Sequence, residues 1–169
     1  GSLSFEPGLE GHGGSTFLGC ASLKILNKLH LLNTDSLLRW CIYNQGNGYK
    51  GRPMKPCDSC YSFWVGSVLS MLSSIKDNKN IHNGTELYYN MTNIRYNRIF
   101  NLYCQSGFGG FSKLPSSPFG DILHGYMGLN GLALMSKQLK HTNFNIFDGY
   151  PNLFKRDVYP ITTCTVNNE

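Results

Sequence analysis

The chain has 169 residues, a length that allows one domain with a real core and little more. Its 15 Lys and Arg outnumber its 10 Asp and Glu, which leaves a net charge of +5, and 13% of its residues are aromatic. Because the net charge is low and apolar side chains are plentiful, an intrinsically disordered chain is excluded. The cations form no run along the sequence, so we expect no nucleic-acid partner.

The sequence also argues against a membrane span and a leader. Its longest apolar stretch, residues 61–72, is broken by Ser and Gly and is shorter than the roughly 20 residues that cross a bilayer. The chain opens without a basic segment or an apolar run, which argues against a signal peptide and favours the cytoplasm. The six cysteines lack the spacing of a disulfide framework, so we expect reduced thiols and regard the sequons at Asn83 and Asn90 as accidental.

Five segments follow the apolar spacing of helices. In chain order, the predicted helices span residues 13–29, 34–45, 58–74, 85–105 and 121–138. The first, third and fifth are apolar around most of their circumference, whereas the second, with Thr34 as its N-cap, and the fourth carry one apolar stripe. Inner helices touch neighbours on every side and outer helices cover them with one face. The alternation therefore predicts an all-α protein of stacked helical hairpins in two concentric layers.

An internal repeat supports this architecture. A Gly-rich segment, residues 44–53, precedes the third predicted helix, and a similar segment, residues 105–115, precedes the fifth. Asp58 and Asp121 stand at corresponding places in the two copies, and the first helix, headed by His12, looks like a third copy. Each Gly-rich loop leads to the N-terminus of an inner helix, so the repeat brings the same end of every copy to one rim.

Three metal-binding residue types are predicted to meet at this rim. Asp58 and Cys60 lie at the start of the third helix, and His124 lies at the equivalent place in the fifth. A carboxylate, a thiolate and an imidazole make a three-ligand zinc set with one position left for a substrate. A Cys near a helix start is more often a small core residue, and on spacing alone both interpretations stay open. The repeat favours the metal site because it independently places all three residues at one rim.

Donors for an anion gather at the same rim. They are His12 at the head of the first helix, Arg52 and Lys55 in the loop before the third, Lys113 in the loop before the fifth, and Tyr61. Helix N-termini, cations and a phenol together suit phosphate oxygens. Solvated surface charge is the alternative for each residue taken singly, but it does not predict their convergence. The inner helices also carry aromatic side chains. If the rim binds an anion, these side chains could line an apolar funnel below it; taken singly, each is expected to fill the core. They are Phe17, Phe63, Trp64 and Tyr126.

Three ordered motifs carry a likeness to a known family. They are GHGGSTF at residues 11–17, GRPMKPCDSCYSFW at residues 51–64 and LHGY at residues 123–126. These resemble the β subunits of the protein prenyltransferases, most closely those of type I geranylgeranyltransferases, and correspond to the downstream part of such a subunit. The resemblance implies an α/α toroid, an α6-α6 barrel, present here as a partial barrel over residues 1–140. Residues 141–169 form a tail of unassigned structure.

The resemblance implies roles for individual residues. Asp58, Cys60 and His124 match the family's zinc ligands. The residues that match those holding the isoprenoid diphosphate are His12, Arg52, Lys55 and Tyr61. Trp64 matches an aromatic residue of the lipid cavity, and Leu123 matches the type I enzymes where farnesyltransferase carries a tyrosine. Lys113 is similar to the lysine that in type I enzymes replaces a magnesium-binding carboxylate, so the resemblance implies zinc without magnesium.

The function implied by the resemblance is that of a catalytic β subunit. Such an enzyme transfers a geranylgeranyl group from its diphosphate to the cysteine thiol of a C-terminal CaaX motif, on proteins such as small GTPases. It pairs with an α subunit, and we expect no activity without that partner and the upstream helices of the barrel. Because half a barrel leaves apolar helix faces exposed, we also expect the isolated piece to be insoluble or molten.

Other interpretations remain at this point. Within the family, the chain could belong to a farnesyltransferase or a Rab geranylgeranyltransferase. From another class, it could be a non-catalytic helical scaffold that retains a structural zinc. A third is a Cys/His hydrolase with Cys60 as nucleophile. Against this third interpretation, Asp58 lies too near Cys60 to orient a distant histidine.

Overall fold

The computed structural model describes residues 1–76, 92–136, 139–141 and 146–147. Its helices are α1 (Gly13–Ile25), the 3-10 helix η1 (Leu29–Leu31), α2 (Thr34–Tyr43), α3 (Tyr61–Lys76), α5 (Ile94–Tyr103) and α6 (Ile122–Met135). Two short strands, β1 (Leu139–His141) and β2 (Ile146–Phe147), follow α6. Among the helices in these ranges, none combines the length and the apolar character that crossing a bilayer requires.

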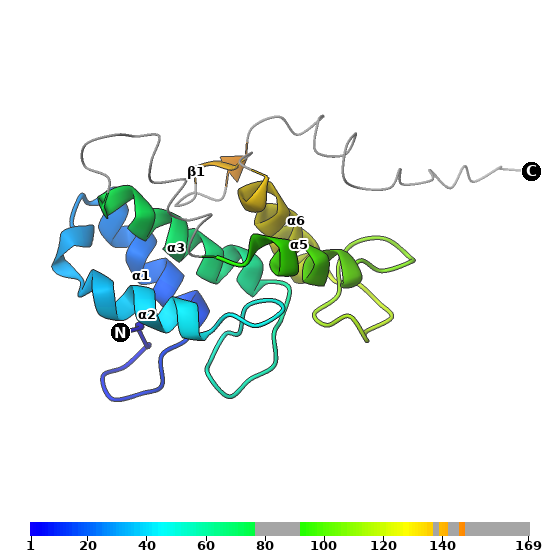
Figure 1. Ribbon diagram of the computed structural model, residues 1–169, viewed down its shortest axis with the longest axis horizontal. Helices are drawn as coiled ribbons and strands as arrows, with labels where there is room; N and C mark the ends of the chain where they lie inside the picture. The colour runs from blue at the N-terminus through cyan, green and yellow to red at the C-terminus, as the bar shows by residue number, and fades with distance from the viewer. Residues whose placement is uncertain (77–91, 137–138, 142–145, 148–169) are drawn as a thin grey trace, which may run out of the picture.

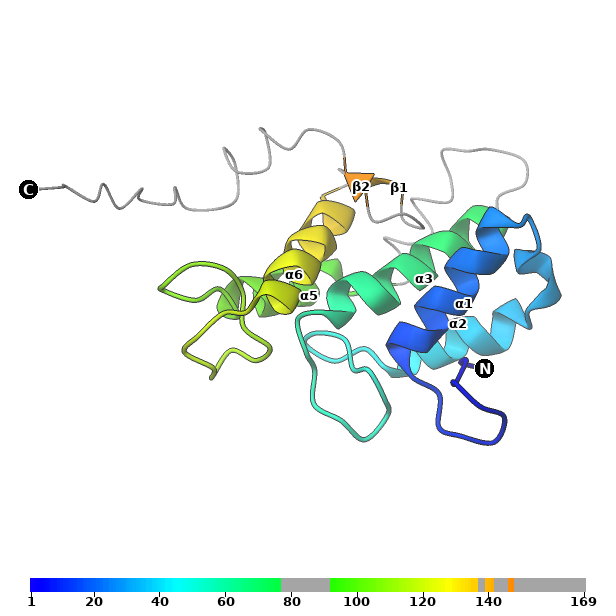
Figure 2. The same ribbon diagram turned by 180° about the vertical axis from the view of Figure 1, so that it is seen from behind.

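The helices form two layers. In the inner layer α3 packs against α1 on one side and against α6 on the other, while α2 packs on α3 and α5 packs on α6 from outside. Figure 1 shows α2 and α5 on the near side, and Figure 2, from behind, shows α6, α3 and α1 side by side. The two long loops that precede α3 and α6 lie at the N-terminal ends of these helices, along the lower side of the view (Figure 2). The predicted alternation of inner and outer helices is therefore present.

The core lies between these layers. Its largest cluster joins α1, α2 and α3 through fully buried side chains such as Leu37, Phe63 and Met71, and a smaller cluster under α6 includes Phe111 and Leu132. The five cysteines in the described ranges are free thiols, as predicted: Cys20, Cys41, Cys57, Cys60 and Cys104. Cys164 and both sequons lie outside the described residues.

The repeat is visible in the hydrogen bonds that start each inner helix. In every copy the residue at the helix start accepts a backbone N–H two or three positions ahead with its side chain. The pairs are His12 Nδ1 with the N–H of Gly14 at 3.0 Å, Asp58 Oδ1 with that of Cys60 at 3.0 Å, and Asp121 Oδ1 with that of His124 at 2.9 Å. The three starting residues also donate their own N–H groups to equivalent loop carbonyls, those of Leu3, Tyr49 and Phe111. Three copies of one supersecondary unit are thus present.

Adjacent copies are joined by one repeated contact at this rim. The N–H of Gly13 donates to the carbonyl of Gly51 at 2.9 Å, and the N–H of Ser59 donates to the carbonyl of Lys113 at 3.1 Å. In each case the residue after a helix start binds the Gly-rich loop of the next copy. The register of the repeat therefore decides which side chains of neighbouring copies meet.

The predicted ends of the first two helices need correction. The first ends at Ile25, because Asn27 adopts a left-handed φ of 57° and the N–H of Lys28 donates to the carbonyl of Leu23, which closes a Schellman motif. The N-cap of α2 is Asn33, whose side chain accepts the N–H of Ser36, so the prediction of Thr34 as N-cap is wrong.

The predicted ranges of the other helices begin too early or extend too far. The third starts at Tyr61, because the chain turns at residues 58–60 before it becomes helical. The fourth starts at Ile94 after the cap Asn93, and residues 85–91 of its predicted range lie outside the described residues. In the fifth, Asp121 is the N-cap and the helix ends at Met135, whereas residues 137–138 are not described.

The small sheet was not expected from the sequence. β1 and β2 pair antiparallel, with Leu139 opposite Phe147 and His141 opposite Ile146, and both strands contact α6. β1 straddles the boundary predicted between residues 140 and 141. The strands are short, and the described part of the chain is otherwise helical.

Candidate metal and anion site

The three predicted metal ligands come together at the rim of the inner layer. Asp58, Cys60 and His124 each offer one ligand atom, and these atoms all lie within 4.8 Å of one another. Asp58 and Cys60 are buried at the turn before α3, and His124 stands in the first turn of α6 with its side chain 11% exposed. Among the residues that the structure describes, this is the one group of three or more such side chains close enough to share an ion.

The chemistry of this group fits zinc. Carboxylate oxygen, thiolate sulfur and imidazole nitrogen are ligands that zinc takes in proteins. His124 Nε2 lies 3.2 Å from Asp58 Oδ1, while His124 Nδ1 lies 2.6 Å from Asp121 Oδ2. Nδ1 is thus occupied by Asp121, and Nε2 is the ring nitrogen that faces Asp58 and the sulfur of Cys60. One oxygen, one sulfur and one nitrogen therefore face a common point, so the residues present suit a bound metal.

The surroundings of Cys60 favour the protonated thiol when no cation is bound. Burial raises its pKa above the ordinary range, and the neighbouring Asp58 carboxylate raises it further. A nucleophilic cysteine needs the opposite environment, one that lowers the pKa of the thiol. This geometry therefore disfavours the hydrolase interpretation.

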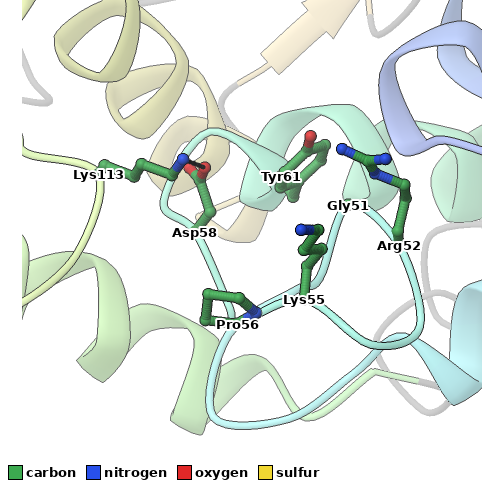
Figure 3. A pocket seen from close by; sticks show the side chains of 7 residues that line it. All are labelled: Gly51, Arg52, Lys55, Pro56, Asp58, Tyr61 and Lys113. Carbon is green, nitrogen blue, oxygen red and sulfur yellow. Dashed lines mark ion pairs between the residues drawn. The ribbon is translucent and has the colours of Figure 1, made fainter.

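Lys113 links the metal candidates to the neighbouring cavity. Its Nζ lies 3.8 Å from Asp58 Oδ2, and its side chain is 57% exposed. The two oxygens of Asp58 thus face different partners, Oδ1 toward His124 and Oδ2 toward Lys113. The ammonium group remains accessible to an anion, and Figure 3 shows the pair at one edge of the cavity.

His12 and Tyr61 form the second pair at the rim. His12 Nε2 lies 2.7 Å from Tyr61 Oη, and His12 Nδ1 accepts the N–H of Gly14. Burial lowers the pKa of His12, and Arg52 lowers it further, so the ring is neutral at pH 7. Because Nδ1 is an acceptor, the hydrogen of the neutral ring is on Nε2 and is donated to Tyr61. The hydroxyl hydrogen of Tyr61 is then available to another acceptor.

A cavity of about 190 Å³ lies beside Tyr61 and Lys113, and His12 is not among the residues that line it. Its walls are Gly51, Arg52, Lys55, Pro56, Asp58, Tyr61 and Lys113. Figure 3 shows the Arg52 guanidinium, the Lys55 ammonium and the Tyr61 hydroxyl directed to the same space. Burial raises the pKa of Tyr61 to about 12, so the phenol keeps its proton and acts as a donor. Three cations and one neutral donor, with the Asp58 carboxylate at one edge, make a hollow that suits an anion.

The remaining predicted residues lie nearby. Trp64 is half-buried and packs edge to face on Phe17, with ring centroids 5.1 Å apart, in a cluster with Phe63. Leu123 is 52% exposed and Tyr126 is 48% exposed on α6. Arg52 is also within 3.9 Å of Glu10, and both side chains are about half exposed.

Asp121 is the residue that the sequence reasoning missed. It entered that reasoning only as a helix start, yet its carboxylate holds the imidazole of His124. The backbone N–H of His124, and to a lesser degree its side chain, lower the pKa of Asp121. The signal that could have found it is the spacing of three residues from His124, which places the two side chains in one turn of helix.

Comparison with known proteins settles the family. The profile of the prenyltransferase alpha-alpha toroid domain matches residues 1–162. The chain belongs to this family. It is 36% identical over 151 residues to the geranylgeranyl transferase type-1 subunit beta of Arabidopsis thaliana, an alignment that covers 82% of this chain and 36% of the relative. It is 32% identical over 145 residues to the protein farnesyltransferase subunit beta of Schizosaccharomyces pombe, covering 83% and 37%.

A solved structure agrees with the fold. The chain is similar to the Candida albicans protein geranylgeranyltransferase-I complexed with GGPP, with a TM-score of 0.66 and 25% identity over 94% of this chain and 46% of that chain. The predicted toroid fold and the resemblance to prenyltransferase β subunits are therefore confirmed. The chain spans about a third of the length of the curated relatives that match most of it.

Proposed function

We propose that this chain is part of the catalytic β subunit of a type I protein geranylgeranyltransferase. The observation that carries the proposal is that Asp58 belongs to two sites at once. It is one of the three metal candidates, and it also lines the cationic cavity beside Lys113. A diphosphate in the cavity and a thiol at the metal would therefore be neighbours, which is what transfer between them requires.

The proposed reaction is a substitution at carbon. The sulfur of a cysteine in a C-terminal CaaX motif attacks the first carbon of geranylgeranyl diphosphate, and a carbon–sulfur bond forms. The bond between that carbon and the diphosphate oxygen breaks, and diphosphate leaves with the electron pair. The thiol proton goes to solvent, so the product is a thioether.

The chain's own residues supply charge and position. Arg52, Lys55 and Lys113 balance the charge that grows on the departing diphosphate, and Tyr61 donates a hydrogen bond to it. Asp58, Cys60 and His124 would hold zinc, which when bound keeps a substrate thiol deprotonated at neutral pH. Trp64, within the aromatic cluster of α1 and α3, would line the path of the prenyl chain.

The proposal includes the partners and conditions implied by the family. The β subunit would act with an α subunit, in the cytoplasm, on CaaX proteins such as small GTPases. Zinc would be the metal. The ammonium group of Lys113, already paired with Asp58, would stand where a magnesium-dependent enzyme needs a second ion, so magnesium would not be required.

Transfer assays test the proposal. The full-length subunit is purified with its α partner and given geranylgeranyl diphosphate and a peptide that ends in Leu. We expect transfer that needs zinc and falls by at least about a thousandfold in Cys60→Ala and His124→Ala, because each change removes a metal ligand. Cys57→Ala is the matched control, since Cys57 lies outside the metal group and its loss is expected to leave the rate nearly unchanged. Absence of transfer with zinc present would overturn the proposal.

Farnesyl transfer is the second candidate. It is favoured by the match to farnesyltransferase β subunits, including 40% identity over 77 residues with that of Pisum sativum. Competition between the two diphosphates at equal concentration separates the candidates. We expect the geranylgeranyl product to dominate; a farnesyl product in excess would reassign the chain within the family.

A further inference from the structure

His124 is held from behind by Asp121. Oδ1 of the carboxylate accepts the backbone N–H of His124 at 2.9 Å, and Oδ2 lies 2.6 Å from its ring Nδ1. One side chain thus fixes both the start of α6 and the orientation of the imidazole. The two contacts use different oxygens of the same carboxylate. Rotation of the Asp121 side chain would therefore break both of them.

The contact with Nδ1 has a consequence for the opposite nitrogen. An ionised carboxylate can only accept, so when the imidazole binds a metal its one hydrogen is on Nδ1. Nε2 is then left with its lone pair, and it is Nε2 that faces Asp58 Oδ1 at 3.2 Å. A metal can bind only a ring nitrogen that carries no hydrogen. Asp121 therefore selects the tautomer that the metal site needs.

The repeat shows that this contact is particular to the third copy. In the first two copies the side chain at the helix start reaches into the next copy, His12 to Tyr61 at 2.7 Å and Asp58 to His124 at 3.2 Å. Asp121 stands at the same position of the repeat, but its side chain contacts the imidazole of a residue in its own helix, His124. The equivalent of His124 in the second copy is Tyr61, whose ring is held by His12 instead.

We propose that Asp121 is a positioning residue of the metal site, which fixes the Nδ1–H tautomer and the orientation of His124. This inference rests on the zinc site of the proposed function. Partners of this kind behind a metal-binding histidine contribute about 10- to 100-fold in metal affinity. The same loss is expected here when the contact is removed.

Asp121→Asn separates the positioning role from the capping role. Asparagine is as good an N-cap as aspartate, so its side-chain oxygen can keep the N–H of His124. Its amide NH₂ then faces Nδ1 and donates to it, which moves the ring hydrogen to Nε2 and blocks the ligand atom. We expect zinc affinity, measured by competition with a chromogenic chelator, to fall about 10- to 100-fold while the melting temperature of the zinc-free protein stays unchanged.

The experiment uses the full-length protein purified with its partner subunit. A second readout is ¹⁵N NMR of histidine in the zinc-free protein, recorded at a pH high enough that its imidazoles are neutral, where we expect the Nδ1–H tautomer of His124 in the wild type and the Nε2–H tautomer in Asp121→Asn. Asn33→Ser, a change at the cap of α2, is the matched control and should leave both readouts as they are. Equal zinc affinity of the wild type and Asp121→Asn would overturn this inference alone, whereas a wild type that binds no zinc would overturn the metal site of the proposed function.

Discussion

At the scale of single residues, Tyr61 lines the cationic cavity and contacts His12. Its oxygen accepts from His12 and its hydroxyl hydrogen remains for a ligand. We expect Tyr61→Phe to weaken the binding of an isoprenoid diphosphate about tenfold, because one hydrogen bond to a charged group is lost. Isothermal titration measures this. Tyr43→Phe, at an 82% exposed position on α2, is the control, and equal affinity of the two variants would contradict the assignment.

His12 is expected to make stability depend on pH. Burial lowers its pKa in the folded protein below the ordinary value of about 6.5, so between the two values the unfolded chain binds a proton that the folded chain does not. The free energy of unfolding therefore decreases as the pH falls through about 6.5, the ordinary pKa of the unfolded histidine, toward the lower pKa of the folded protein. His12→Asn keeps a capping side chain but cannot titrate. Denaturant melts of the full-length protein, purified with its partner subunit, should show a smaller loss in this variant, and an equal loss in both proteins would contradict the expectation.

The sequence could predict which residues form the site but not how each is held. Spacing within the repeat placed Asp58, Cys60 and His124 at one rim, because the period of a repeat can be seen in the sequence itself. The contact of Asp121 with the ring of His124 depends on a side-chain rotamer and on a helix start that was assigned one residue early. Neither can be read from residue types alone.

At the scale of elements, the close packing of α3 on α6 depends on a glycine. A Cβ at Gly131 would lie 1.9 Å from Ser62 Oγ and 3.1 Å from the backbone of Ser62. We expect Gly131→Ala to lower the free energy of unfolding by about 1–3 kcal/mol, because the helices must move apart. Gly107→Ala, where a Cβ meets nothing within 4 Å, is the control, and both variants are unfolded by denaturant in the full-length protein purified with its partner subunit. A Gly131→Ala protein as stable as this control would contradict the packing.

Apolar periodicity could predict the helices but not their ends. Residues 26–29 keep the apolar pattern of α1, yet the left-handed backbone of Asn27 stops the helix. The chain at Asp58 also looks helical in sequence, but its side chain caps a turn that precedes α3. Local capping interactions decide where these helices begin and end. They depend on one or two residues, whereas the apolar pattern continues past the helix end without a break.

At the scale of the whole molecule, the inner helices at both edges of the row expose apolar side chains. Leu18 and Ile25 on α1 are about half exposed, and Ile122 on α6 is 92% exposed. We expect the 169-residue piece alone to be insoluble or molten, with strong binding of a hydrophobic dye and no sharp calorimetric transition. A sharp cooperative melt of the purified piece would contradict this.

The central claim is that Asp58, Cys60 and His124 bind one zinc ion beside the cationic cavity. X-ray absorption at the zinc edge, on the full-length protein purified with its partner subunit, tests it most directly. The account predicts one zinc per β subunit with a single protein sulfur at about 2.3 Å and the other protein ligands nitrogen or oxygen, plus a second sulfur when a thiol peptide is added. Four protein ligands that do not change with the peptide, or no bound zinc, would contradict it.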